Sequence, residues 1–323
     1  MRIGLHSDKT SFPNLALMKL SAWHKSKGDD VRMYDPLFAS QFEKVYSSKV
    51  FTFTEEDREL IGNIEKGGTG YKLFHQLPVE IEHICPDYSL FNLDYSLGFL
   101  TRGCPNKCAW CIVPQKEGNI YAHADVEEFL QHDKVVLMDN NVLSSPYGLH
   151  QIEKLARLGV KVDFNQGLDA RLIDDSIARL LARVKWLAPI RLACDSQSQM
   201  SAVLNAVTLL RWHNARPVRY FAYCLVQDVD EAIERVKFLK GLNVTPFAQP
   251  FIDYEGGKLP TKRQLEFSRW VNHAAVFNTA AWEEYDVNVR KGRANNRLQA
   301  TQKAGRENPS LSFSAVAPGL SVA

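Results

Sequence analysis

GFLTRGCPNKCAWCIVPQKEGN, residues 98–119, holds three of the six cysteines of this chain. Cys104, Cys108 and Cys111 follow a C-x3-C-x2-C spacing. Three thiols this close in sequence can converge on one inorganic centre, whereas a disulfide would use two of them and leave the third unpaired. We therefore expect a metal centre in this loop, with the rest of the chain built around it.

The surroundings of the thiols bear on which metal they hold. Structural zinc takes four protein ligands, often as two separate pairs. Only one compact cysteine group is present here, although Cys85 or His83 upstream could supply a fourth ligand, so zinc stays open as an alternative. Three thiolates on a four-iron cluster leave one iron without a protein ligand, and an open coordination position is typical of reactive metal sites. The spacing favours an iron-sulfur centre.

The motif CPNKCAWC, with Trp110 directly before the last cysteine, resembles the cluster-binding motif of the radical S-adenosylmethionine (SAM) superfamily. The flanking TRGC and CIVP look like the same loop in the methylthiotransferase-type branch. The resemblance implies a [4Fe-4S] cluster on Cys104, Cys108 and Cys111 whose unique iron chelates the methionine part of SAM. It also implies reductive cleavage of SAM to a 5′-deoxyadenosyl radical, Trp110 near the adenine, and a low-potential flavodoxin or ferredoxin as electron donor.

Composition is that of a globular protein. The chain has 323 residues, 45% of them hydrophobic, and a formal net charge of +2. Such a small charge creates no global field that would indicate a nucleic-acid partner. The sequence contains no long apolar run, and its first residues have no apolar signal-peptide core. We expect a cytoplasmic protein with no membrane partner, in a reducing compartment that suits an iron-sulfur site.

Residues 1–88 are predicted to form a small Rossmann-like α/β domain. We expect strands at 2–6, 31–34 and 50–53 and helices at 15–27 and 55–64. This arrangement is similar to the truncated N-terminal domains of several radical SAM branches. The cobalamin-binding pattern Asp-x-His-x-x-Gly is absent, and so are the three further cysteines that methylthiotransferases carry here. GGTGY, residues 67–71, invites comparison with a phosphate-binding loop, but no clear strand precedes it and a flexible turn is the favoured interpretation.

From Ser96 the pattern alternates between strands and amphipathic helices, which predicts parallel β/α units. The predicted strands are 97–101, 135–139, 160–165, 188–194, 218–226 and 244–251. The predicted helices are 126–132, 151–158, 174–183, 199–212 and 230–242. Six such units predict an α/β fold with a partial (β/α)6 barrel over residues 89–260, of the radical SAM type that the cysteine loop resembles.

The loops at the carboxyl ends of parallel strands share one rim, so polar residues there are candidates for holding SAM. These residues are Asp139, Asn140, Gln166, Arg191 and Asp195. Each region also has a purely structural interpretation. The Asp-Asn-Asn run could form a helix cap and turn, and the polar residues after Gln166 could form surface interactions. Arg191 could pair with a structural carboxylate such as Asp163, and Asp195 could cap the following helix. The family usually has a glycine-rich stretch ending in Glu where this chain has Asp-Asn-Asn.

Residues 261–323 are predicted to contain a helix at 261–276 and then a basic, disordered tail. Residues 287–306 carry basic residues and no Asp or Glu: Arg290, Lys291, Arg293, Arg297, Lys303 and Arg306. Such a run either contacts nucleic acid or forms a solvated tail.

The function expected from the resemblance is that of a radical SAM enzyme acting on a substrate that the sequence does not name, with a nucleic acid or nucleotide as first hypothesis. Two alternatives remain. One is a non-enzymatic zinc or iron-sulfur protein that contacts nucleic acid. The other is a degenerate family member that keeps the cluster but does not bind SAM.

Overall fold

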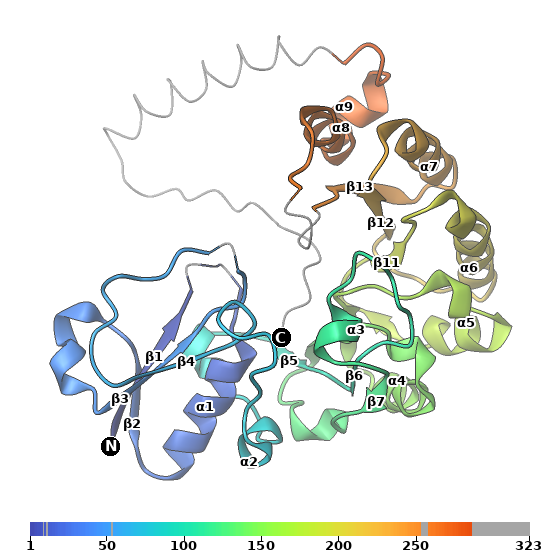
Figure 1. Ribbon diagram of the computed structural model, residues 1–323. Coiled ribbons are helices and arrows are strands. Elements are labelled where there is room, and N and C mark those ends of the chain that lie inside the picture. Colours follow the sequence, from blue (N-terminus) through green and yellow to red (C-terminus); the bar gives the residue numbers. More distant parts are fainter. Residues whose placement is uncertain (9, 11, 53, 253–257, 286–323) are drawn as a thin grey trace. The chain divides into compact units, whose positions relative to one another are not determined.

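The computed structural model in Figure 1 describes residues 1–323 except 9, 11, 53, 253–257 and 286–323. Within this part the chain is mixed α/β, with parallel sheets, and divides into two compact units. The first unit contains Met1–Arg191 and Asn205–Arg219, and the second contains Leu192–Leu204 and the described residues from Tyr220 on. This division does not coincide with the boundaries predicted at residues 88 and 260.

A four-stranded sheet in the order β2-β1-β3-β4 opens the first unit. All three strand pairs are parallel. Helix α1 begins where the Asn14 side chain accepts a hydrogen bond from the amide of Leu17. The predictions for the first strand, first helix and second strand are confirmed. The bounds are β1 Arg2–Ser7, α1 Leu15–Ser26, β2 Asp30–Met33, β3 Lys44–Ser48 and β4 Ile64–Gly67.

The next two predicted elements are wrong. The third strand is β3, several residues before the predicted 50–53, and residues 55–63 contain no helix among those described. Helix formation over 55–64 is disfavoured because Gly62 has a left-handed φ of +115° and the stretch lacks an apolar stripe. Ile64–Gly67 instead pairs with β3. A strand therefore does precede the GGTGY turn, contrary to the prediction.

A second parallel sheet, in the order β10-β9-β8-β5, carries the cysteine loop. Its strands are β5 Ser96–Gly98, β8 Lys134–Leu137, β9 Lys161–Phe164 and β10 Lys185–Trp186, and helices α4 Pro146–Leu158 and α5 Asp175–Ala182 accompany them. Leu15 and Met18 of α1 pack in one core with Leu97, Phe99 and Met138. Leu17 and Leu20 of the same helix pack in a separate cluster with Ile3 and Leu5 of β1, so α1 contributes to the cores at both sheets.

Short elements complete the first unit. They are the 3-10 helices η1 Pro36–Gln41, η2 Tyr88–Phe91, η3 Val126–Glu128, η4 Val142–Ser144 and η5 Ala170–Leu172, the helices α2 Val79–Glu82 and α3 Val113–Lys116, and the strands β6 Thr101–Arg102 and β7 Tyr121–Ala122. The helix predicted at 126–132 is reduced to the single turn η3. Phe129 ends that turn, and its ring packs against Gly98, where a Cβ atom would lie 2.7 Å from the ring.

The sheet β11-β12-β13 follows, and β11 begins in the first unit and ends in the second. Its strands are β11 Ile190–Ala193, β12 Tyr220–Val226 and β13 Thr245–Pro250; the helices are η6 Gln197–Gln199, α6 Met200–Trp212, α7 Val229–Gly241, α8 Lys262–Asn272 and α9 Ala274–Thr279. In the second unit, buried Arg235 donates to the carbonyls of Cys194 and Leu225. The helix predicted at 261–276 divides into α8 and α9, because His273 leaves helical geometry.

Every strand predicted after residue 89 is present, although 97–101 is broken into β5 and β6. The strand ladders among the described residues form separate sheets and no closed barrel. No helix in that part of the chain combines the length and apolar character needed to cross a membrane. The basic run 287–306 and residues 310–323 lie outside the described residues, so the predictions made for them stay predictions.

Candidate cluster site

The cysteine loop leaves and re-enters the fold through a narrow neck. Strands β6 and β7 pair antiparallel on its two sides. Gly103 has a φ of +77°, and a Cβ atom on it would lie 2.2 Å from the carbonyl oxygen of Asn119. The amide of Cys104 then donates to the carbonyl of Gly118 at 3.1 Å. Only glycine fits this close approach of the two chain segments, and the neck therefore fixes the backbone position of Cys104.

Glu117 closes the neck with a buried carboxylate. Its Oε2 accepts from the amide of Gly103 at 2.8 Å and from Asn140 Nδ2 at 2.9 Å, while its Oε1 accepts from the Arg102 guanidinium at 2.6 Å. Sequence reasoning did not single out Glu117, because an isolated carboxylate carries no motif. The amide of Asn140, a predicted SAM ligand, is used here to hold the loop.

Asp139 is also a positioning residue. Its Oδ1 accepts from the amide of Leu100 at 3.1 Å, the amide of Thr101 at 2.5 Å and the Thr101 hydroxyl at 2.7 Å. Burial raises the pKa of this carboxyl to about 6, even though the hydrogen bonds from Thr101 and Leu100 oppose the rise. Its contacts favour the structural alternative, because both oxygens already face the strand that leads into the cysteine loop.

Asn141 is the third residue of the run and lies against a thiol. Its Nδ2 is 3.6 Å from Cys104 Sγ and 3.4 Å from Asp169 Oδ2. Its Oδ1 is buried and has no hydrogen-bond partner among the described residues. A buried acceptor without a donor is costly, so this atom is suited to accept a hydrogen bond from a ligand at the site. Sequence reasoning placed the run at the rim but did not single out Asn141.

A second polar group reaches the loop from the end of β9. Asp169 accepts from Asn106 Nδ2 at 3.0 Å and from the Arg171 guanidinium at 2.6 Å. The pKa of Arg171 is raised, mainly by its hydrogen bond with Asp169 and further by the thiolates of Cys108 and Cys104. A cation therefore lies within electrostatic range of two of the three predicted ligands.

The three thiols belong to one electrostatic neighbourhood. The amide of Cys111 donates to the carbonyl of Cys108 at 3.1 Å, which folds the loop back on itself. The pKa of Cys111 is raised, first by desolvation and then by negative charge on Cys108 and Cys104. In the described residues, no group of three or more His, Cys, Asp or Glu side chains is arranged to hold a single metal ion.

The residues present fit an iron-sulfur cluster by their chemistry. The donors are three thiols, and the Arg171–Asp169 ion pair lies beside them. The unpaired Oδ1 of Asn141 provides an acceptor beside Cys104. A four-iron cluster binds each thiolate through a different iron, so the sulfurs need not meet at one point as they must around one zinc ion.

The other predicted ligands lie in different settings. Trp110 is 40% exposed, and Gln166 is partly buried in the turn before Gly167, so contact of either with SAM stays a prediction. Arg191 forms an ion pair with Asp163, which is the structural alternative for this arginine. Asp195 belongs to the second unit, where its Oδ1 accepts from the amide of Leu225 at 2.9 Å. That bond ties the end of β11 to β12.

Residues that follow three neighbouring parallel strands thus contact one another at the same edge of the sheet. Thr101 and Cys104 come after β5, Asp139 and Asn141 after β8, and Asp169 after β9. The carboxyl edge of a parallel sheet is where ligands bind in α/β folds. Comparison with known protein families and with curated proteins found no match for this chain.

Proposed function

We propose that the protein is a radical SAM enzyme in which Cys104, Cys108 and Cys111 hold a [4Fe-4S] cluster. The observation that carries the proposal is a C-x3-C-x2-C loop at the carboxyl edge of a parallel sheet, with polar residues from the next two strands beside it. When bound, the cluster supplies the electron that cleaves SAM to methionine and a 5′-deoxyadenosyl radical. The β/α units would then form the partial barrel that holds the substrate.

Residues of the loop and its neighbours have separate tasks in this proposal. Glu117 and Gly103 keep the neck closed and so hold the two ends of the cysteine loop together. Asn141 donates to Cys104 Sγ, and hydrogen bonds to cluster sulfurs tune the reduction potential. The free Oδ1 of Asn141 would accept from the ammonium group of SAM, a role that the sequence suggested for Asp139.

The partners of the reaction follow from the same resemblance. A low-potential flavodoxin or ferredoxin would deliver the electron, because SAM cleavage needs the reducing end of the cluster potential range. A nucleic acid or nucleotide is the first candidate substrate, supported by the methylthiotransferase-like loop and the basic run 287–306. The run lies outside the described residues, so this choice depends on the sequence alone.

Anaerobic reconstitution tests the proposal. The full chain should bind about four irons, turn brown and form 5′-deoxyadenosine from SAM under dithionite. Replacing Cys104, Cys108 and Cys111 together with Ala should abolish both iron binding and product, whereas Cys85→Ala, a cysteine outside the loop, should retain both. A colourless protein with one zinc per chain would establish the zinc alternative. Iron without product, and no SAM binding by calorimetry, would establish the degenerate alternative.

A further inference from the structure

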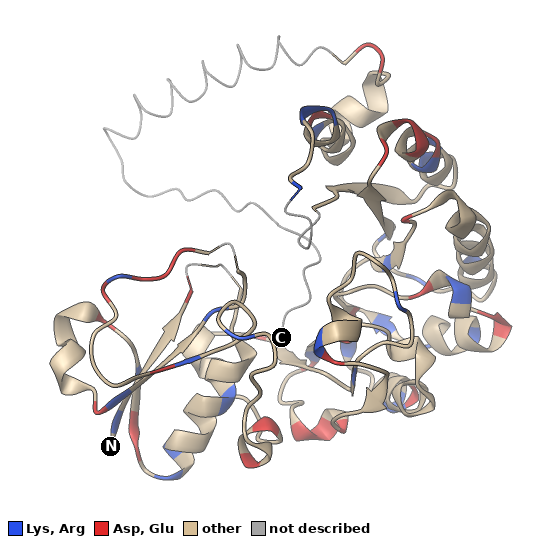
Figure 2. Ribbon diagram, viewed as in Figure 1, with Lys and Arg blue, Asp and Glu red and all other residues tan. Residues whose placement is uncertain are grey.

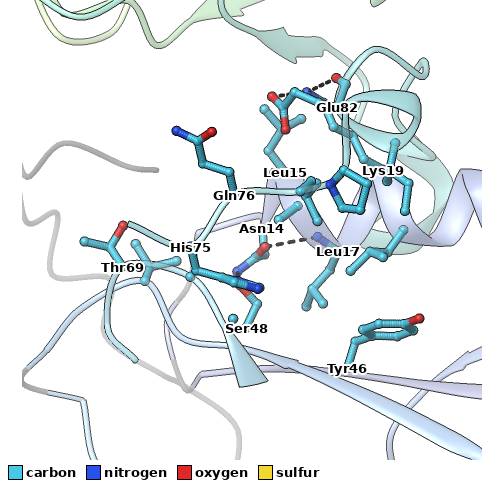
Figure 3. Close-up of a pocket in the computed structure, with 18 of the residues that line it drawn as sticks. Asn14, Leu15, Leu17, Lys19, Tyr46, Ser48, Thr69, His75, Gln76 and Glu82 are labelled. Atoms are coloured by element: carbon cyan, nitrogen blue, oxygen red, sulfur yellow. Dashed lines mark hydrogen bonds and ion pairs between the residues drawn. The ribbon is translucent and has the colours of Figure 1, made fainter. Parts of the chain in front are cut away.

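A cavity of about 460 Å³ lies at the N-terminal sheet, within the first compact unit. Figure 3 shows Leu17 of α1 on one side of it and Thr69 with His75, from the segment after β4, on the other. Arg102 and Lys116, from the two ends of the cysteine loop, also line it. The volume is that of ordinary small-molecule sites.

The sheet topology explains why a cavity opens here. The chain runs from β1 outward to β2 and then returns to add β3 on the other side of β1. In parallel sheets the crevice outside such a reversal, at the carboxyl ends of the strands, is where ligands bind. Asn14, which caps α1, and Ser47 and Ser48, at the end of β3, all line the cavity at this point.

The turn after β4 forms another wall, and it is tightly packed. Gly68 has a φ of +86°, and a Cβ atom on it would lie 2.5 Å from the carbonyl oxygen of Lys49. A Cβ on Gly67 would lie 2.9 Å from His75 Nδ1. GGTGY is therefore a fitted turn at the end of a strand, which brings the Thr69 hydroxyl to the cavity.

Charge along the N-terminal elements is mixed, with Lys and Arg interspersed among Asp and Glu (Figure 2). Most basic residues lining the cavity are already paired with carboxylates: Lys19 with Glu82 at 2.8 Å, Lys44 with Glu65 at 2.6 Å and Arg102 with Glu117 at 2.6 Å. These pairs neutralise each other, so they add little net attraction for a charged ligand.

Lys116 is different. Its ammonium donates to the Thr69 hydroxyl at 2.8 Å, and no carboxylate of the described residues lies within ion-pair distance of it. The side chain is partly buried, and its pKa is lowered to about 8 by burial and by the neighbouring Arg102. A partly buried cation at a cavity wall is stabilised by an anion that enters the cavity.

We propose that this cavity binds a small molecule bearing a phosphate group, which Lys116 and Thr69 hold. The body of the ligand would lie against the apolar wall formed by Leu15, Leu17 and Tyr46. Because Lys116 and Arg102 stand at the two ends of the cysteine loop, the ligand would connect that loop to the N-terminal sheet. The binding site is independent of the proposed cluster chemistry.

Calorimetry on the full chain tests this site with three probes: inorganic phosphate, adenosine 5′-monophosphate (AMP) and uncharged adenosine. We expect phosphate or AMP to bind, and AMP to bind at least about tenfold more tightly than adenosine. Lys116→Met should weaken binding by about tenfold or more, and Lys116→Arg should retain most of it. Lys72→Met is the matched control, because this exposed lysine follows the same turn but does not line the cavity.

Two further measurements keep the result interpretable. Thr69→Val removes only the hydroxyl that orients Lys116 and should weaken binding several-fold without altering the melting temperature beyond a few degrees. The variant without Cys104, Cys108 and Cys111 should bind the same probe unchanged, which separates this site from any SAM site. The proposal is overturned if neither phosphate nor AMP binds, or if Lys116→Met binds as tightly as the wild type.

Discussion

Asp139→Asn isolates the cost of a buried charge next to the cysteine loop. Three donors converge on Asp139 Oδ1: the amide of Leu100, the amide of Thr101 and the Thr101 hydroxyl. An asparagine in the same rotamer presents a carbonyl oxygen to all three. Its Nδ2 replaces Oδ2, which accepts only the longer branch of the Leu100 amide bond, at 3.2 Å. The substitution therefore removes the charge and keeps the main acceptor, whereas Asp139→Ala removes both.

The magnitude follows from the pKa of Asp139, which is raised from 3.8 to about 6. A rise of about two units corresponds to about 3 kcal/mol. Between pH 4 and 6 the folded state retains a proton that the unfolded chain has released, so wild-type stability falls as pH rises through this window. Asparagine does not titrate, so the free energy of unfolding of the variant lacks this pH-dependent contribution from residue 139. As pH rises through this window, the free energy of unfolding of the variant relative to that of the wild type should therefore increase by up to about 3 kcal/mol.

Urea unfolding of wild type and Asp139→Asn, from about pH 3.5 to 7.5 at equal iron content, measures this difference in the free energy of unfolding. Asp139→Ala should be destabilised by about 3 kcal/mol or more throughout, because it leaves buried amides and a hydroxyl without an acceptor. A difference between Asp139→Asn and wild type that does not change with pH would refute the assignment of a raised pKa. An equal loss of unfolding free energy in the Asn and Ala variants would show that the hydrogen bonds to Oδ1 do not stabilise the fold.

Three further predictions concern the loop and Asn141 beside it. Gly103→Ala should destabilise the chain by about 2 kcal/mol or more in urea unfolding and lower its iron content, because the new Cβ meets the Asn119 carbonyl at a left-handed φ. Glu117→Ala should leave Arg102 and the Gly103 amide unpaired, and reconstituted protein should lose its iron faster in air than the wild type does. Asn141→Ala should reduce SAM affinity about tenfold by calorimetry at unchanged iron content, because it removes the buried acceptor Oδ1.

How much of the fold could be predicted differs between the two halves of the chain. From residue 89 on, strands with strong apolar patterns such as β12 and β13 were located to within a few residues. In the N-terminal part, β3 and β4 have the sequences KVYSS and IEKG, which carry weak strand patterns of their own. Their strand state comes from pairing between neighbours, a tertiary effect that local propensity does not contain.

The candidate site shows the same limit. Cysteine spacing was enough to predict the three thiols as cluster ligands, because the motif lies within eight consecutive residues. The tasks of Glu117 and Asn141 depend on contacts that join segments far apart in sequence, such as the bond from Asn140 to Glu117. Sequence reasoning could place Asp139 at the rim, but it could not show that the amides of residues 100 and 101 already occupy its oxygens.

The Asp-Asn-Asn run is where the family that the loop resembles has a glycine-rich stretch, and this difference motivated the hypothesis of a cluster protein without SAM. The contacts divide the run into three tasks: Asp139 holds the strand that enters the loop, Asn140 holds the neck through Glu117, and Asn141 faces Cys104. In the described part of this run, only Asn141 keeps a buried acceptor without a donor. The enzymatic and the degenerate hypotheses therefore make different predictions for this oxygen atom: in the first it accepts a hydrogen bond from SAM, and in the second it does not. If SAM affinity falls when Asn141 is replaced, the enzymatic hypothesis is supported. If the replacement leaves SAM affinity unchanged, the main physical reason to prefer the enzymatic over the degenerate hypothesis is removed.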